Sequence, residues 1–192
     1  MEDGRMSKIQ PDLSSVASKG LCALADALTA IGIPTAERAG ATGFLKGVRI
    51  ESGSIFYDPS AAVSDILHEA GHIATMPPAG RPHANGDIVT AHRFLGALLE
   101  ERMQEVLHDD FIHACLQCSD PEATAWAYAF GTACGYTPDQ IICSKQYDGQ
   151  GDAVRLGLGM GQYVGINGLR AAGFLGSIRE FPKLKKWMQD AI

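Results

Sequence analysis

The stretch Ser64-Asp65-Ile66-Leu67-His68-Glu69-Ala70-Gly71-His72-Ile73 contains the motif His-Glu-x-x-His inside an apolar run. This motif is the strongest indication of the fold of the chain. Residues four apart lie one turn above each other on the same face of an α-helix. His68 and His72 can therefore offer imidazole nitrogens to one metal ion, and this spacing is typical of zinc ligands. Glu69 lies about 100° around the helix from His68, where a carboxylate can hold a water molecule and take its proton. The motif predicts a Zn²⁺ site with Glu69 as general base.

The flanking residues predict that the motif lies on a buried amphipathic helix over about residues 60–75. Asp58-Pro59-Ser60 is expected to cap this helix, and Pro77-Pro78 stops it. Gly71 lowers helix propensity, which is tolerable where another element packs close to the helix. The apolar residues at helical spacing are Val63, Ile66, Leu67, Ala70, Ile73 and Ala74.

Composition bounds the class of protein. The chain has 192 residues, 46% hydrophobic and 20% charged, as in a folded globular protein. Its formal net charge of −6 argues against nucleic acid as the main partner. No apolar run is long enough to cross a membrane, and the N-terminus lacks the apolar core of a signal peptide. The five cysteines are odd in number and scattered along the chain, which suits reduced thiols. We therefore expect a cytoplasmic protein without a membrane partner; nothing in the sequence sets its oligomeric state.

The pattern along the chain predicts an α+β fold that is mainly helical, with a small antiparallel sheet ahead of the metal-binding helix. Residues 1–11 are expected to form a polar N-terminal lead, and residues 12–192 a single domain. The expected strands cover 44–50 and 54–57, joined by the turn Glu51-Ser52-Gly53, after a connector over 35–42. The segment 76–87 is expected to be a loop. The other expected helices cover residues 13–31, 88–117, 121–134, 152–164, 167–174 and 178–188, with a short helical turn at 138–143.

The third metal ligand is not decided by spacing. A metzincin needs Gly and His where this chain has Thr75 and Pro78, so that class is excluded. Asp87 lacks the Gly-Thr-x-Asp signature that would mark an aspzincin ligand. A gluzincin takes a Glu from a later helix, and two stretches qualify. They are Glu100-Glu101 and Glu122, although the first pair also fits a solvated helix face and Glu122 fits a capping box with Ser119.

Two segments, 55–75 and 119–136, resemble the small bacterial zincins of the ImmA/IrrE type. In those proteins a strand leads into His-Glu-x-Gly-His, here His68 to His72, and a later helix carries Glu-x-x-Ala and an aromatic residue. The second match is Glu122-Ala123-Thr124-Ala125-Trp126-Ala127-Tyr128-Ala129. The chain resembles still more closely a group of uncharacterised proteobacterial proteins with the Ala-Trp-x-Tyr-Ala run and a downstream Tyr-x-Gly, here Tyr147-Asp148-Gly149. The resemblance implies a zincin-like fold of the gluzincin type, with Glu122 as third ligand and Glu69 as base.

Hydrolysis by a zincin also needs a donor for the oxyanion that forms on the substrate carbonyl. We favour His83, because it lies on the loop that leaves the metal helix, and Asp65 is a candidate carboxylate for orienting an imidazole. Cys115 and Cys118 have metal or redox spacing, but no second cysteine pair accompanies them. The other candidate donors are His92, Tyr128, Tyr136 and Tyr147.

The function that fits this pattern is a zinc-dependent hydrolase, most simply a metallopeptidase acting on a peptide or protein substrate. Two alternatives stay open: a zincin-fold regulatory or binding module that holds metal without peptidase activity, and a helical domain without metal. We further expect the long segment 76–118 to restrict access to the motif, and residues 54–57 to form an exposed edge strand that could take a peptide by strand addition.

Overall fold

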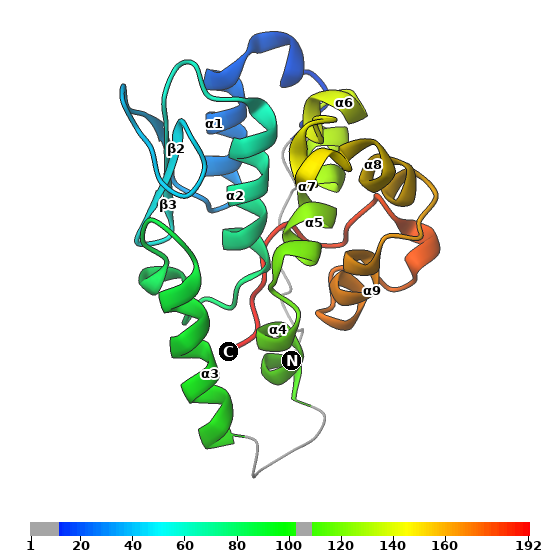
Figure 1. The fold of residues 1–192 in the computed structure, drawn as a ribbon. Helices are drawn as coiled ribbons and strands as arrows, with labels where there is room; N and C mark the ends of the chain where they lie inside the picture. The colour runs from blue at the N-terminus through cyan, green and yellow to red at the C-terminus, as the bar shows by residue number, and fades with distance from the viewer. Residues whose placement is uncertain (1–11, 103–108) are drawn as a thin grey trace, which may run out of the picture.

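The computed structural model describes residues 12–102 and 109–192 (Figure 1). The predicted N-terminal lead, residues 1–11, lies outside the described residues. The strands are β1 (Thr35–Glu37), β2 (Val48–Glu51) and β3 (Ser54–Tyr57). The helices are α1 (Leu21–Ala30), α2 (Val63–Thr75), α3 (Val89–Arg102), α4 (Asp110–Leu116), α5 (Asp120–Ala133), α6 (Pro138–Ile141), α7 (Gln146–Gly149), α8 (Gly151–Gly159) and α9 (Val164–Ala171), with 3₁₀ turns η1 (Ala17–Lys19), η2 (Arg81–His83) and η3 (Ile178–Glu180).

The α+β class is confirmed, but the sheet is mixed rather than antiparallel. Strand order is β1-β3-β2, with β3 antiparallel to β2 and parallel to β1. The predicted hairpin turn is present, with positive φ at Ser52 and Gly53 as a two-residue turn requires. β1 falls in the segment that we expected to be a connector. Because β3 pairs on both sides, it is not the free edge strand that the sequence suggested.

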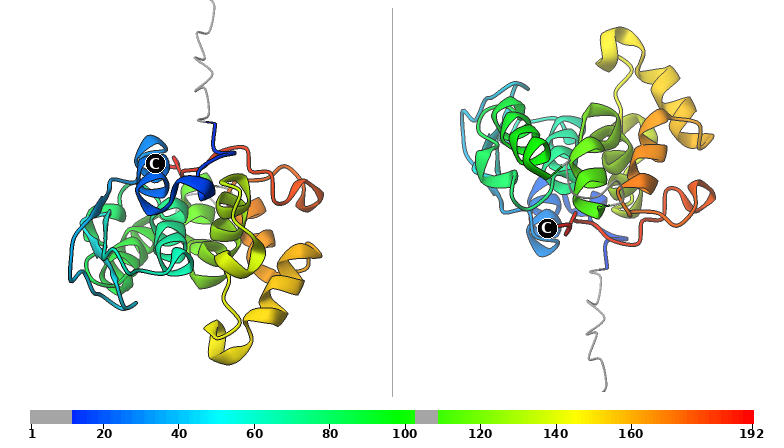
Figure 2. Two further views of the ribbon diagram at one scale, coloured as in Figure 1. Left: turned by 90° about the horizontal axis from the view of Figure 1, so that it is seen from above. Right: turned by 90° about the horizontal axis from the view of Figure 1, so that it is seen from below.

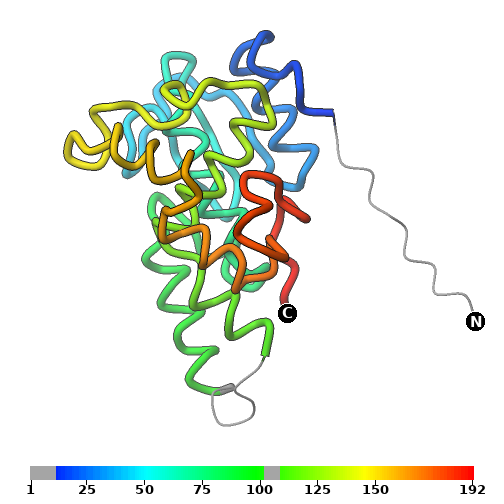
Figure 3. Tube along the Cα trace, turned by 90° about the vertical axis from the view of Figure 1, so that its right-hand side faces the viewer, coloured from blue at the N-terminus to red at the C-terminus, as the bar shows by residue number. Residues whose placement is uncertain are grey.

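Helices α2 and α5 form the centre of the molecule. They lie side by side and antiparallel, with the sheet and α1 on the outer side of α2 and with α8 and α9 on the outer side of α5 (Figures 1 and 2). Helices α3 and α4 extend together from one end of this arrangement (Figure 3). Within the described residues, none of these helices combines the length and the apolar character that crossing a bilayer would need.

The contact between α2 and α5 depends on Gly71. A Cβ at this position would lie 2.9 Å from Ala123 Cα and closer still to the Ala123 carbonyl oxygen. Because that obstacle is helix backbone, it cannot rotate away as a side chain can. The expectation that Gly71 lets another element pack against the motif helix is confirmed, and the element is the first turn of α5.

Several element boundaries differ from the sequence predictions. The first predicted helix is broken at Gly20, which has a φ of +83°. The helix predicted over 88–117 is two separate helices, α3 and α4. The motif helix begins at Val63 rather than near residue 60, because the Asp58 carboxylate accepts hydrogen bonds from the Ser60 and Gly40 amides and does not cap the helix.

The helix predicted over 178–188 is wrong. Only Ile178–Glu180 forms a 3₁₀ turn, and Pro182 then removes a backbone donor. The last residues run against the central helices instead (Figure 1). The Trp126 indole N–H donates to the carbonyl of Trp187, and the Gln189 amide donates to the carbonyl of Ala74 at the end of α2.

We expect Gly71→Ala to destabilise the fold. The added methyl group forces the backbones of α2 and α5 apart, and overpacking of this kind costs about 1–3 kcal/mol. Urea unfolding followed by far-UV circular dichroism measures the change. Gly96→Ala is the matched control, because a Cβ on Gly96 in α3 meets nothing within 4 Å and should stabilise its helix by about 0.5–1 kcal/mol. Equal stability of the two variants would contradict the close-packing argument.

Candidate metal centre

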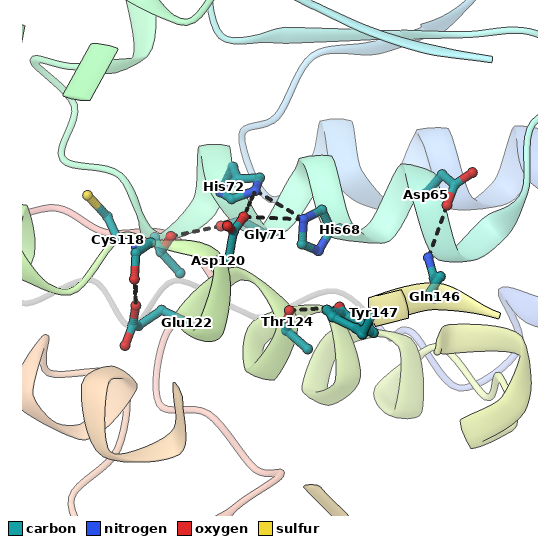
Figure 4. Close-up of polar contacts among 12 residues, drawn as sticks. Asp65, His68, Gly71, His72, Cys118, Asp120, Glu122, Thr124, Gln146 and Tyr147 are labelled. Atoms are coloured by element: carbon teal, nitrogen blue, oxygen red, sulfur yellow. Dashed lines mark hydrogen bonds and ion pairs between the residues drawn. The ribbon is translucent and has the colours of Figure 1, made fainter. Parts of the chain in front are cut away.

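His68, His72 and Asp120 converge on one point between α2 and α5 (Figure 4). The two histidine Nε2 atoms are 3.1 Å apart. Asp120 Oδ1 lies 3.2 Å from Nε2 of His72 and 3.7 Å from Nε2 of His68. These three are the one group among the described residues in which at least three His, Cys, Asp or Glu ligand atoms could hold a metal ion together.

The spacing fits a tetrahedral metal site. With ligand bonds of about 2.0–2.1 Å, two donors on a tetrahedral zinc lie about 3.3 Å apart, and the three distances here fall around that value. Two imidazole lone pairs and a carboxylate oxygen repel one another at this range unless a proton or a cation lies among them. A proton bridges two of the three atoms, whereas a metal cation bonds to all three.

The site is buried on one side and open on the other. The side chain of His72 is 5% exposed, that of His68 18%, and that of Asp120 75%. The predicted cover by residues 76–118 therefore does not close the site on the Asp120 side. Within the described part of the chain, His72 Nδ1 is buried without a hydrogen-bond partner. Asp65, the candidate for orienting an imidazole, accepts a hydrogen bond from Gln146 instead.

Electrostatics favour a neutral imidazole and an ionised carboxylate. Burial lowers the pKa of His72 to about 4, so its ring is neutral at pH 7 and presents a lone pair. The His68 and His72 imidazoles beside Asp120 hold the pKa of its carboxyl well below its usual range. A neutral imidazole and a carboxylate are the protonation states in which these groups bind a metal ion.

Glu69 lies on α2 next to the metal group and is buried, with 6% of its surface exposed. Burial raises its pKa to about 7; the nearby His68 opposes this shift, and Asp65 and Asp120 add to it. A carboxyl group with a pKa near neutrality can both accept and release a proton at pH 7. The general-base role that the sequence predicts for Glu69 requires this ability.

The structure brings Asp120, not Glu122, to the two histidines. Asp120 is the first residue of α5, and the antiparallel packing places that end of α5 against the end of α2 that carries His72 (Figure 4). Residues two apart on a helix do not share a face. When Asp120 faces α2, Glu122 therefore faces away from it.

Glu122 instead forms the capping box that was its alternative interpretation. Its carboxylate accepts hydrogen bonds from the Ser119 amide at 3.1 Å and from the Ser119 hydroxyl at 2.6 Å. A Cβ on Gly168 of α9 would overlap this carboxylate, so the absence of a side chain there makes room for it. The carboxylate of Glu122 thus lies between Ser119 and α9 rather than at the metal group.

The other candidate ligands and donors lie elsewhere, with one exception. Glu100 and Glu101 are exposed on α3 and do not belong to the metal group of the described residues. His83, our favoured oxyanion donor, stacks on Phe94 with ring centroids 3.9 Å apart. His92 Nε2 lies 3.1 Å from the carbonyl oxygen of Cys118.

Tyr147 is the exception. Its ring packs edge-on against His68, with centroids 6.4 Å apart, and its hydroxyl lies 2.8 Å from that of Thr124 on α5. Tyr163, just before α9, lies near the same residues: burial raises the pKa of its phenol, and the charge of Asp120 adds to the rise. Burial raises the pKa of Tyr147 to about 12, so this phenol is protonated at pH 7. Tyr147 is one of the five candidate donors that the sequence predicts, whereas Asp120, Thr124 and Tyr163 are not among the predicted site residues.

The cysteine pair gives no second metal group. Burial raises the pKa of Cys118 to about 12, and its thiol donates to the carbonyl of Cys115. Neither cysteine joins a metal-type cluster in the parts of the chain described by the structure.

Comparison of the chain with protein-family models, with curated proteins and with solved structures finds no match.

The position of Glu122 predicts that its removal affects stability. We expect Glu122→Ala to lower the free energy of unfolding by about 1–2 kcal/mol, because the cap on α5 is lost. Glu122→Gln should cost less than about half of that, since glutamine also completes a capping box. Chemical denaturation of the metal-free protein measures both. Equal losses in the two variants would mean that the charge of Glu122, and not its capping bonds, matters.

Proposed function

We propose that this protein is a zinc-dependent hydrolase of the zincin type, acting on a peptide or protein substrate. The observation that carries the proposal is the convergence of His68 Nε2, His72 Nε2 and Asp120 Oδ1 at tetrahedral spacing. Glu69, buried on the same helix, supplies the general base that such a site needs.

The donor set supports zinc. Two imidazoles and one carboxylate are a usual set for catalytic zinc, which keeps its fourth position open. His68, His72 and Asp120 would hold the ion, and the exposed side of Asp120 leaves the site accessible to a substrate. Bound zinc would supply a Lewis acid and lower the pKa of water to about 7.

The chemistry of this chain's own residues centres on Glu69. Its carboxylate accepts the proton of the attacking water while the water oxygen bonds to the amide carbon. The same proton is then delivered to the departing nitrogen as the carbon–nitrogen bond breaks. A group with a pKa near neutrality suits both halves of this transfer.

The fold also supports a zincin. A small sheet precedes the helix that carries the motif, and a second helix, antiparallel to the first, contributes the third ligand. This is the order of elements that the resemblance to the ImmA/IrrE type implies. The proposed site differs from that pattern in its third ligand, which is Asp120 at the start of the second helix.

We expect the purified protein to bind one equivalent of Zn²⁺, and Asp120→Asn to weaken that binding by at least about 100-fold. The reason is that an amide oxygen carries no charge, and losing a mere supporting partner of a ligand already costs about 10–100-fold. Competition with a chromophoric chelator measures the affinity.

Glu122→Gln is the matched control for this experiment, because it changes an acid to an amide two residues away on the same helix turn. It should bind zinc like the unmodified protein. If Glu122→Gln weakens zinc binding and Asp120→Asn does not, the ligand assignment is wrong. If the unmodified protein binds no zinc, the proposed function falls.

Glu69→Gln should keep its zinc and lose turnover. Because glutamine cannot accept the proton of the attacking water, we expect kcat on a quenched fluorescent peptide library to fall by about 100-fold or more. Zinc content by mass spectrometry confirms that the site is intact. A zinc-loaded protein that cleaves no peptide, with or without Glu69, would favour the alternative of a metal-holding binding module.

A further inference from the structure

The segment 145–151 lies beside His68 of the metal group, and both central helices hold it. From α2, the Asp65 carboxylate accepts a hydrogen bond of 3.1 Å from the Gln146 side chain. From α5, the Thr124 hydroxyl lies 2.8 Å from the Tyr147 hydroxyl. Figure 4 shows the Tyr147 ring next to His68 with its hydroxyl directed at Thr124.

The backbone of this segment is strained where it carries Tyr147. Tyr147 has φ, ψ of 56°, 48° and Asp148 has 55°, 36°, both in the left-handed region, and Gly149 follows with φ +81°. The left-handed conformation costs roughly 1–2 kcal/mol for each residue other than glycine. Such strain persists where surrounding bonds impose it, and it gathers at functional sites.

The hydroxyl groups of Thr124 and Tyr147 leave one proton for a ligand. Thr124 is fully buried, and its hydroxyl hydrogen-bonds to the phenol of Tyr147. Two hydroxyl groups carry two protons, and the bond between them uses one. When Thr124 donates this bond, the O–H of Tyr147 is free to donate outward.

From this geometry we infer that Tyr147 is a catalytic residue that donates a hydrogen bond to the carbonyl oxygen of the substrate, and that Thr124 positions its phenol. The inference deepens the proposed function and rests on it. Tyr147 replaces His83 as the favoured oxyanion donor, because the His83 ring stacks on Phe94 rather than on an imidazole of the metal group.

The reaction step balances without a further reagent. The water oxygen bonds to the carbonyl carbon, its proton passes to Glu69, and the π electron pair of the carbonyl moves onto the carbonyl oxygen. That oxygen becomes an anion, and the Tyr147 phenol donates a hydrogen bond to it while keeping its own proton. A preorganised donor of this kind contributes about 100–1,000-fold to kcat in other hydrolases.

Tyr147→Phe tests the inference, because phenylalanine keeps the ring on His68 and removes the hydroxyl alone. We expect kcat to fall by about 100-fold, with KM, zinc affinity and melting temperature close to those of the unmodified protein. The second readout is binding of a phosphonamidate peptide, a tetrahedral mimic with an anionic oxygen. Isothermal titration calorimetry of the zinc-loaded protein should show its affinity reduced by about 10-fold or more.

Tyr136→Phe is the control. The Tyr136 hydroxyl is buried and has no hydrogen-bond partner in the described residues, so its loss should change neither kcat nor phosphonamidate affinity. Thr124→Val gives an independent test through the positioning role, and we expect kcat to fall by about 10-fold at unchanged KM. This variant also covers the case in which Tyr147→Phe does not fold.

The outcomes separate this inference from the function on which it rests. If unmodified protein binds zinc and cleaves peptide, but Tyr147→Phe keeps full kcat and full phosphonamidate affinity, the inference is overturned and the hydrolase stands. Unchanged kcat in Thr124→Val overturns the positioning role. If the unmodified protein binds no zinc, the proposed function fails first, in a measurement that involves no variant, and the role of Tyr147 fails with it.

Discussion

The close approach of the first turn of α5 to α2 is the constraint on which the rest of the structure depends. Packed helices usually lie 8–10 Å apart, and a side chain at Gly71 would prevent anything closer, because its Cβ would meet the backbone of Ala123. On the other side of the same turn, α9 approaches through Gly165 and Gly168, where a Cβ would meet Pro121 and Glu122. The glycines of α2 and α9 thus let both helices pack closely against the first turn of α5. The short side chain of Asp120 reaches the imidazoles because this packing holds its backbone near α2.

The sequence predicts half of this site well, because that half is local. The positions of His68, Glu69 and His72 follow from helical periodicity within one element, and the structure keeps all three on α2. The third member of the group depends on which face of α5 turns toward α2. Asp120 and Glu122 both suit the first turn of a helix, so local propensity does not separate them. Tertiary packing makes the distinction, because Gly165 and Gly168 let α9 pack against the face of α5 that carries Glu122. These two glycines were the available sequence signal of that packing.

The same division explains the errors in the fold. Strand β1 has three residues without apolar alternation, and it is a strand only because β3 offers it a parallel partner. The C-terminal segment has helical periodicity, but bonds from Trp126 and to Ala74 give its backbone other partners. The left-handed turn at Tyr147 has only Gly149 as a local signal. In each case contacts with residues far away in the sequence override the local pattern.

The charges around the metal group are ones that a bound cation would offset. The charges of Asp65 and Asp120 add to the rise that burial causes in the pKa of Glu69, in a chain whose formal net charge is −6. Burial drives Glu69 toward its neutral form, and it keeps the His72 ring neutral, with one N–H and one lone pair. A divalent ion among the three ligand atoms would offset the carboxylates and use the lone pair of His72. Anything that binds the folded state alone also stabilises it. The unfavourable electrostatic interactions among these groups in the metal-free protein would therefore be relieved by a bound metal ion.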